Sequence, residues 1–492
     1  MRAVVSRRPS QKIAVAVVFV AAMFMSIMDA TIVNVALPTI GRDFHTSATA
    51  VDSVSISFLV SLAVFIPASG WLGDRFGGKR ILLSAIVVFT VASALCGVAQ
   101  DMTELVLFRV LQGVGGGMLT PVGMAMLYRA FPPEERVRAA SVLTMPTALA
   151  PALGPVLGGL LVTDLSWRWV FYVNVPIGIA ALIFGVLTLE PGAERHPGRF
   201  DARGFALAGI GLGLLMYGVS EGPVQGWATT PVLATIAVGA VMLAALVALE
   251  LRVPQPLVDL RLLKDGLLRT GTAVILLLTA SLLGMLYVIT LFYQDGRGLS
   301  ALQAGLSTFP EALGVMLGAQ LASRLIYPRL GPRRHAFLGG VGMAIFVGLL
   351  ALVGAHTSLW VPRLLLFAMG LSMAQVFVPV QAAAFATISP AATGRASTMF
   401  NAMRQLGGAI GVAVFTSVIV AVGATARAGG HVVANLGSYH AALLAAAGFA
   451  ALAALAALAI RDADAHATMG RLPGPAAGDA ASESEPVLAM EF

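Results

Sequence analysis

The sequence predicts an all-α polytopic membrane protein with fourteen transmembrane helices, arranged as two six-helix halves plus two inserted helices. The first reason is composition: 58% of the 492 residues are hydrophobic and only 11% are charged, whereas a soluble protein carries roughly 25% charged residues. The second reason is that apolar runs of membrane length recur at a steady spacing. The third is that Lys and Arg gather in every second segment between these runs.

The apolar runs define the expected helices in order. Their approximate positions are 13–38, 54–73, 80–99, 104–128, 139–163, 168–189, 204–220, 231–250, 269–293, 303–326, 335–355, 359–385, 397–423 and 439–460. The runs do not alternate apolar with polar residues, so a β-barrel is not expected. The first run exceeds the roughly 7–15 apolar residues of a cleaved signal peptide, and we expect it to remain as the first helix.

The distribution of basic residues predicts the orientation. Lys and Arg are frequent before the first span and in every second loop after it, and few lie in the other loops. Because cytoplasmic loops retain positive charge, we expect a multi-pass protein of the cytoplasmic membrane with both termini in the cytoplasm. The same rule accounts for the net charge of +7, so no nucleic-acid partner is inferred.

A weak internal repeat predicts the domain organisation. Arg75–Arg80 resembles Arg329–Arg334, and Arg109 precedes Arg363 by the same interval. Duplicated halves around a midplane site are a common transporter plan, although many channels are repeated too. The expected parts are a cytoplasmic N-terminus at 1–12, an N-terminal six-helix half at 13–189, a linker with two extra transmembrane helices at 190–268, a C-terminal six-helix half at 269–461 and a disordered cytoplasmic tail at 462–492.

Asp29 is the most informative residue, because it lies well inside the first apolar run. A carboxylate in hydrocarbon costs several kcal/mol unless it is paired, hydrated or protonated, and binding and releasing a proton is the simplest use for it. Arg109 lies within the fourth run. It either snorkels to the interface or faces a cavity, where its positive charge would favour the charged form of a nearby carboxylate.

The loop between the second and third runs predicts a conformational latch. Glycines there allow a tight turn and close helix approach, and Asp74 can accept hydrogen bonds from Arg or from a neighbouring helix N-terminus. Such a charge contact can break as two halves rock; the alternative is an ordinary basic loop. The latch residues are Gly70, Asp74, Arg75, Gly77, Lys79 and Arg80.

The fifth run combines prolines with small residues. Proline frees a backbone carbonyl and kinks a helix, and small residues one turn apart let helices pack backbone to backbone. We expect a helix that bends and also seals tightly, although a generic packing face would have the same composition. The residues concerned are Pro151, Gly154, Pro155, Gly158 and Gly159.

Glu311 is a second carboxylate inside an apolar run, about 15 Å from the outer end, while Asp29 lies about 12 Å deep at 1.5 Å per residue. Similar depths suggest one shared outer cavity for Asp29, Arg109 and Glu311, although a structural hydrogen bond would also explain Glu311. Arg404, within the thirteenth run, is either a substrate contact or a structural partner. The substrate-cavity candidates are Asn34, Gln112, Glu311, Gln381 and Arg404.

Enzymatic and ATP-driven chemistry is not expected. The sequence has no phosphate-binding glycine loop, no His/Cys spacing typical of a metal site and no plausible catalytic triad. The single cysteine, Cys96, lies in an apolar run and excludes an internal disulfide. We therefore expect no cofactor, no metal and no catalytic residue, and an ion gradient as the energy source.

The sequence motifs described above, which lie between Asp29 and Gly411, resemble those of the major facilitator superfamily. Within that family they are most similar to the 14-span drug:proton antiporters of multidrug efflux. Gly70–Arg80 is similar to the family's loop motif, Arg109–Gly117 to its fourth-helix motif and Gly154–Gly159 to the motif associated with antiport. The resemblance implies the major facilitator fold, proton coupling through Asp29 and control of its proton affinity by Arg109. Glu311 departs from the apolar residue usual in relatives, so it could bind a proton or a cationic substrate.

The function expected from this resemblance is proton-coupled export of amphipathic, drug-like or antibiotic compounds by alternating access, with lipophilic or cationic small molecules, protons and the lipid bilayer as partners. A monomer is expected to suffice. A proton-coupled importer or symporter of a small organic solute, and a membrane sensor that transports nothing, remain alternatives at this point.

Overall fold

The computed structural model describes residues 10–46, 48–191, 199–253, 256–423, 425–428 and 431–469. The predicted N-terminal segment lies outside these residues up to position 9, and the predicted tail lies outside them from position 470. The first residues of the predicted tail, however, lie within the described chain. Residues 462–469 pack against the helices, with Thr468 buried in η5 (His466–Thr468), so disorder from position 462 was wrong for this stretch.

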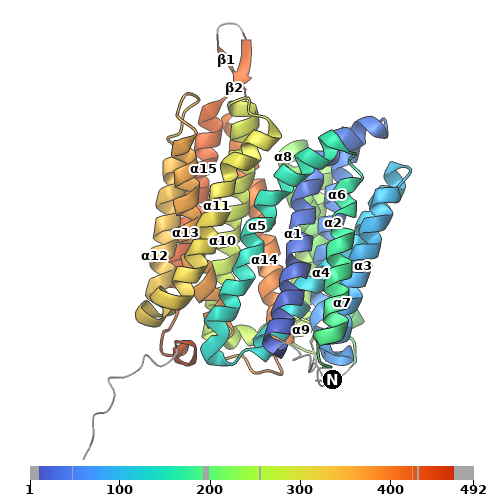
Figure 1. Ribbon diagram of the computed structural model, residues 1–492, viewed down its shortest axis with the longest axis vertical. Helices are drawn as coiled ribbons and strands as arrows, with labels where there is room; N and C mark the ends of the chain where they lie inside the picture. The colour runs from blue at the N-terminus through green and yellow to red at the C-terminus, as the bar shows by residue number, and fades with distance from the viewer. Residues whose placement is uncertain are drawn as a thin grey trace, which may run out of the picture.

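The N-terminal half is a bundle of six membrane-length segments (Figure 1). It consists of α1 (Gln11–Asp43), α2 (Ala48–Phe76), α3 (Gly78–Val98), α4 (Met102–Ala130), η1 (Pro133–Glu135), α5 (Arg136–Asp164), α6 (Trp169–Tyr172) and α7 (Asn174–Thr188). The short α6 continues into α7, and together they form one apolar segment of 20 residues.

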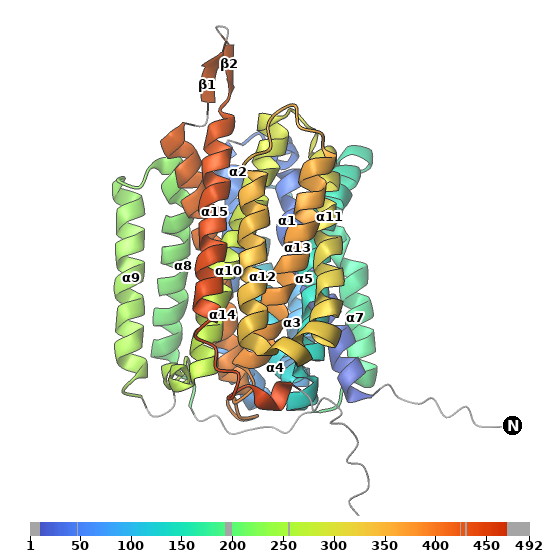
Figure 2. The same cartoon turned by 90° about the vertical axis from the view of Figure 1, so that its left-hand side faces the viewer.

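Two further helices follow the first half, as predicted. They are α8 (Ala202–Gln225) and α9 (Thr230–Glu250), and the short η2 (Leu260–Lys264) leads into the second half. Helix α8 packs on α2 and α14, whereas α9 packs mainly on α8. The pair therefore lies at the side of the molecule, which Figure 2 shows at its left edge.

The C-terminal half contains six more helices and one small hairpin. Its elements are α10 (Gly266–Leu291), η3 (Phe292–Gly296), α11 (Ala301–Leu321), η4 (Ala322–Ile326), α12 (Tyr327–Leu350), α13 (Trp360–Ala384), α14 (Thr393–Val422), β1 (Thr425–Ala428), β2 (His431–Ala434) and α15 (Leu436–Ala457). The antiparallel strands β1 and β2 project beyond the bundle (Figure 1).

The described residues contain fourteen membrane-length helices, which confirms the predicted fold class. Twelve segments meet the criteria of length and hydropathy. One of them, Leu302–Leu350, comprises two spans, because the chain turns at Gly331, whose φ of +69° favours glycine. Helix α5, with 29 residues, is the remaining span. The hairpin is the only addition to an all-helical architecture in the described chain.

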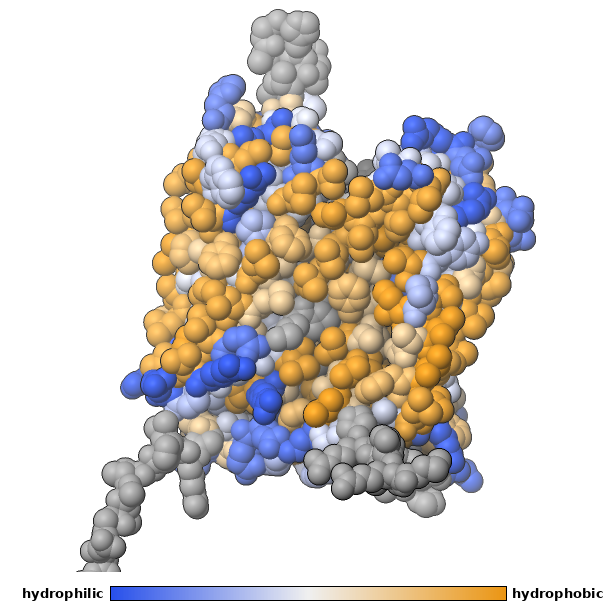
Figure 3. Space-filling view, viewed as in Figure 1, coloured by the Kyte–Doolittle hydropathy of each residue, from blue (hydrophilic) through white to orange (hydrophobic). Residues whose placement is uncertain are grey.

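The two halves meet along a small set of helices. Helix α5 packs on α11 and α13, and α14 packs on α2 and α4. We call the end that carries η1, η5 and Gly331 the basic end and the opposite end, with β1 and β2, the hairpin end. On the face shown in Figure 3, a broad hydrophobic band lies between two hydrophilic ends, as expected for a protein whose sides face lipid.

Candidate functional site

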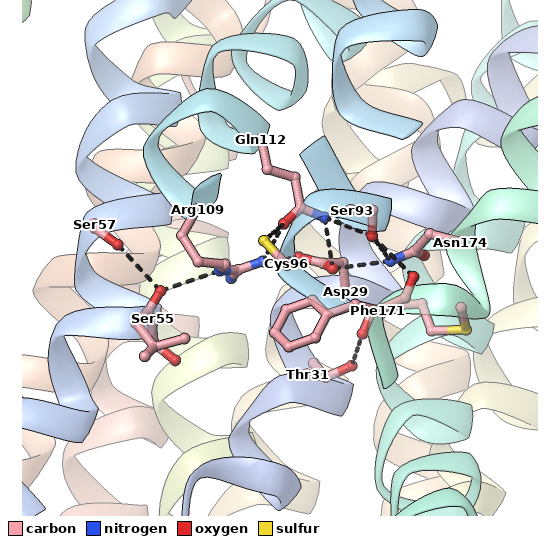
Figure 4. A network of polar contacts seen from close by, with 12 residues as sticks. Asp29, Thr31, Ser55, Ser57, Ser93, Cys96, Arg109, Gln112, Phe171 and Asn174 are labelled. Carbon is pink, nitrogen blue, oxygen red and sulfur yellow. Dashed lines mark hydrogen bonds and ion pairs between the residues drawn. The ribbon is translucent and has the colours of Figure 1, made fainter. Parts of the chain in front are cut away.

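Asp29 and Arg109 form an ion pair inside the N-terminal half. Arg109 Nη1 donates to Asp29 Oδ2 at 2.5 Å. Asp29 is 0% exposed and Arg109 is 1% exposed. The carboxylate comes from α1 and the guanidinium from α4 (Figure 4). A buried pair is tolerated only when further hydrogen bonds satisfy both groups, and neighbouring helices supply these bonds.

Two amides satisfy the second oxygen of the carboxylate. Gln112 Nε2 donates to Asp29 Oδ1 at 2.8 Å, and Asn174 Nδ2 donates to the same atom at 2.9 Å. Both amides also lie within hydrogen-bond distance of Ser93 Oγ, which in turn donates to the Phe171 carbonyl. Figure 4 shows the resulting network converging on Asp29. Four elements of one half, α1, α3, α4 and α7, therefore hold one carboxylate.

The guanidinium of Arg109 is held equally closely. Its Nε donates to the Val54 carbonyl at 3.1 Å, and its Nη1 also reaches Gln112 Oε1 at 2.7 Å. Its carbon atom lies 4.2 Å from the centre of the Phe58 ring and 5.7 Å from that of Phe171, distances at which a cation is attracted to an aromatic face. Arg109 therefore does not snorkel to the membrane surface.

We expect Asn174→Leu to destabilise the protein by about 1–3 kcal/mol, because a buried carboxylate oxygen loses one donor. Thermal unfolding in detergent would measure the loss. Ser55→Ala is the matched control, since Ser55 also donates to a polar side chain, Asn34, but at an exposed position; its effect should stay within about 0.5 kcal/mol. Equal midpoints for both variants would show that the Asn174 contact adds no stability.

The glycines of α5 bring that helix against α1 next to this pair. A Cβ atom at Gly154 would lie 2.1 Å from Thr31 Oγ1, and one at Gly158 would lie 3.1 Å from the Ile32 carbonyl oxygen. A Cβ at Gly159 would meet no atom within 4 Å. Two of the predicted glycines thus form a close helix contact with residues two and three positions after Asp29, whereas Gly159 lies on an open part of the helix surface. Pro151 is partly buried on the same helix, and Pro155 belongs to its helical backbone.

The predicted latch loop lies at the basic end and contacts the other half. Asp74 accepts a hydrogen bond from Arg129 at 2.6 Å, and both side chains surround Gly394 at the start of α14. Gly77, with a φ of +86°, directly precedes α3. Lys79 donates to the Val186 carbonyl at 3.1 Å and also to that of Leu189. The loop therefore ties α2, α3, α4 and α7 together beside α14.

The remaining loop residues, Arg75 and Arg80, are exposed. These two arginines therefore lie on the surface of the basic end, as the alternative of an ordinary basic loop would also place them.

Side-chain hydrogen bonds between the halves cluster at the basic end. Arg136 donates to the Phe385 carbonyl and, at 3.0 Å, to that of Ala386. Tyr128 stacks on Phe385 with ring centres 4.6 Å apart, and Asn401 Nδ2 lies 3.2 Å from Met124 Sδ. The basic ends of the halves are thus closed against each other in this conformation.

Glu311 and Arg404 lie in the C-terminal half, on α11 and α14. Glu311 is 3% exposed, and in the described residues no hydrogen bond or ion pair joins it to Asp29 or Arg109. The Nε atom of Arg404 is buried and has no partner among the residues that the structure describes, while its carbonyl accepts a hydrogen bond from Thr279. The structure therefore pairs Asp29 with Arg109, and Glu311 makes no direct contact with this pair in the described chain.

The other predicted cavity residues lie in three different surroundings. Gln112 belongs to the Asp29 network rather than to an open surface. Asn34 is exposed on α1. Gln381 is buried, and its backbone carbonyl accepts a hydrogen bond from Tyr128 at 3.4 Å, whereas its side-chain Oε1 has no partner within the described part of the chain.

Several important residues were not predicted from the sequence. Asn174 and Ser93 were missed because a single amide or hydroxyl in an apolar run is common and tolerable. Arg129 and Arg136 were counted only as basic loop residues, since charge alone does not show which carbonyl or carboxylate they reach. Within the described residues, no group of three or more His, Cys, Asp or Glu could hold a metal ion.

Comparisons with known proteins give a consistent family. The sequence model of the Major Facilitator Superfamily matches residues 19–412. A "Multidrug resistance protein B homolog" of Mycobacterium tuberculosis is 34% identical over 403 residues, covering 81% of this chain and 74% of that protein. The "Tetracenomycin C resistance and export protein" of Streptomyces glaucescens is 30% identical over 393 residues, covering 80% and 73%.

Solved structures show the same fold. The human organic anion transporter MFSD10 aligns over 91% of this chain and 99% of its own, with a TM-score of 0.63 and 17% identity. The proton:xylose symporter XylE aligns over 91% and 95%, with a TM-score of 0.62 and 17% identity. At such low identity these likenesses concern the architecture alone.

Proposed function

Because the chain belongs to the major facilitator superfamily, we propose that it is a proton-coupled antiporter that exports amphipathic, drug-like compounds by alternating access. The observation that carries this proposal is the buried Asp29–Arg109 pair, an ionisable group at membrane depth with no exposed surface. Such groups mark proton and substrate pathways by default. The names of the relatives, which refer to multidrug resistance and to export of tetracenomycin C, support drug-like substrates.

The proposed orientation places the basic end in the cytoplasm. Basic residues of the described chain gather there, among them Arg129, Arg136 and Arg329, and cytoplasmic loops retain positive charge. The conformation described above is then closed towards the cytoplasm. Release of substrate to the outside is the step that such a conformation serves.

Proton binding to Asp29 would act through the network around it. A neutral carboxyl no longer forms an ion pair with Arg109, and it offers a donor where the Gln112 and Asn174 amides now donate. Protonation would therefore loosen α1 from α4 and α7. Helix α1 packs on α5 through Gly154 and Gly158, and α5 packs on α11 and α13 of the other half. A change at Asp29 would thus reach the interface between the halves.

Glu311 supplies a second site in the other half. It is buried and on a membrane-spanning helix, so it would carry either a second proton or the cationic group of a substrate. Comparing Glu311→Gln with the wild type separates these roles. Loss of export for cationic compounds alone would indicate substrate binding, whereas equal loss for neutral and cationic compounds would indicate proton coupling.

Inverted membrane vesicles test the proposal directly. A fluorescent amphipathic compound should accumulate in energised vesicles that contain the wild type, and collapsing the pH gradient should stop accumulation. Asp29→Asn should reduce gradient-driven accumulation by at least about tenfold, since proton transfer is lost while the hydrogen-bonding shape is kept. Accumulation that continues after the gradient collapses would exclude proton coupling, and full activity of Asp29→Asn would exclude Asp29 as the proton site.

A further inference from the structure

A cavity of about 490 Å³ lies between the two halves near the basic end, and it has no role in the mechanism proposed above. It is lined by Arg138, Ser141 and Val142 from α5 and by Gln320, Ser323 and Arg324 from α11 and η4. Its volume falls within the range of about 300–1,000 Å³ that is usual for small-molecule sites. All but one of its lining residues are polar, although both helices cross the hydrophobic band.

The periodicity of each helix places these polar side chains on one face. Arg138 and Ser141 are three residues apart, and Gln320 stands three and four residues before Ser323 and Arg324; residues at these spacings are neighbours on a helix surface. Ser323 and Arg324 lie in η4, a π-helical segment, and such segments are frequent at functional sites. The π-helix therefore contributes to a polar face that is directed at α5.

The charge in this cavity is positive and unbalanced. Two guanidinium groups, one from each half, line the same space, and no acidic residue lines it. Within the described chain, neither Arg138 nor Arg324 takes part in an ion pair. Arg138 also lies in the first turn of α5, where the helix dipole favours an anion. Both arginines are exposed, so an anion from outside the protein can reach them and supply the negative charge that the lining lacks.

The position of the cavity indicates where this anion comes from. Helices α5 and α11 lie side by side on the face shown in Figure 1. On the same face, hydrophilic side chains gather just beyond the hydrophobic band over the lower ends of these helices (Figure 3). This is the level of the lipid headgroups, and basic pockets between transmembrane helices on the cytoplasmic side bind acidic headgroups.

We propose that the cavity between α5 and α11 binds the phosphodiester headgroup of an anionic phospholipid, held by Arg138 from one half and Arg324 from the other. The Gln320 side-chain amide provides a further donor, whereas the Ser141 and Ser323 hydroxyls donate to the Arg138 and Gln320 carbonyls. A lipid bound in this way joins the two halves at the basic end and favours the conformation in which they are closed there. Only the assignment of the leaflet depends on the orientation proposed above; the binding itself does not depend on transport.

Lipid titration of the purified full-length protein in neutral detergent tests this proposal. Short-chain phosphatidylglycerol is the probe, phosphatidylcholine is the zwitterionic reference, and inorganic phosphate tests for a free anion. Phosphatidylglycerol should bind saturably and raise the unfolding temperature, and Arg138→Gln combined with Arg324→Gln should weaken its binding by about tenfold, because two charge-assisted contacts are lost. Arg203→Gln combined with Arg334→Gln removes the same charge outside the cavity and should change affinity less than about twofold.

Three outcomes would overturn the proposal. One is equal affinity of the wild type and both double variants for phosphatidylglycerol. Another is equal binding of phosphatidylglycerol and phosphatidylcholine. The third is binding of inorganic phosphate as tightly as the lipid, which would assign the cavity to a soluble anion.

A second measurement keeps the proposal testable if the double variant fails to fold. A photo-crosslinking amino acid placed at Val142, which lines the cavity, should capture phosphatidylglycerol from mixed-lipid nanodiscs, with the adduct identified by mass spectrometry. The same group at Leu338, exposed on α12 away from the cavity, should capture lipids in the proportions of the mixture. Equal lipid proportions at both positions would contradict a specific site.

Discussion

Arg109→Gln is expected to be the most damaging single substitution in this protein, with a loss of about 3–5 kcal/mol in the free energy of unfolding. The reason is that the Asp29 carboxylate would remain buried without its counter-ion, and breaking one side of a buried pair leaves an uncompensated charge. Arg363→Gln is a suitable control, because Arg363 also lies near the start of a span but has no carboxylate partner among the described ion pairs. It donates to the Ser307 hydroxyl at 3.3 Å, and its guanidinium carbon lies 5.2 Å from the centre of the Trp360 ring. Its loss should stay near 1 kcal/mol.

The double variant Asp29→Asn with Arg109→Gln separates stability from transport. Neither buried charge remains, so thermal unfolding should return to within about 1 kcal/mol of the wild type, since neutral replacements of a buried pair are often tolerated. Gradient-driven export should stay absent, because no carboxyl group remains in the network to bind and release a proton. If the double variant exports at the wild-type rate, the pair is purely structural. If it is as unstable as Arg109→Gln alone, the uncompensated charge is not the cause of the instability.

Gly70→Ala is expected to slow export by about tenfold, because it obstructs closure of the basic end. A Cβ atom at position 70 would lie 2.7 Å from Thr398 Oγ1 and 3.1 Å from the Gly394 carbonyl oxygen, both on α14 of the other half. Overpacking of this kind costs on the order of 1–3 kcal/mol. The cost falls only on the conformation in which the halves are closed at this end, so it changes the balance between conformations rather than the fold.

A second-site substitution tests this explanation. Thr398→Ala removes the nearer of the two obstructing atoms, so Gly70→Ala combined with Thr398→Ala should recover part of the export rate. Labelling of a cysteine introduced at the buried Ser397, in a Cys96→Ala background, would report opening of the basic end and should increase in Gly70→Ala. The control is Gly448→Ala, since a Cβ there meets no atom within 4 Å. Unchanged labelling in Gly70→Ala would contradict the proposed obstruction.

The sequence by itself determined the spans, the family and the two unusual charges in the N-terminal half. Span positions are readable because the hydropathy of a window depends only on its own residues. Asp29 and Arg109 stand out because a charge in an apolar run is costly wherever the rest of the chain lies. The glycines at 154 and 158 were also readable as sites of close approach, although the helix that approaches them was not.

Only the tertiary structure decided which groups meet. Helices that are apolar nearly all round give no periodic signal for the buried face, so the sequence did not show that Gln112 and Asn174 turn towards Asp29 while Asn34 turns away. Equal depth suggested a common site for Glu311 and Arg109, but depth fixes one coordinate and leaves the position around the bundle undetermined. The position of Arg138 and Arg324 in one cavity depends on that undetermined coordinate, because the two residues are far apart in the chain and line the same space only when α5 packs on α11.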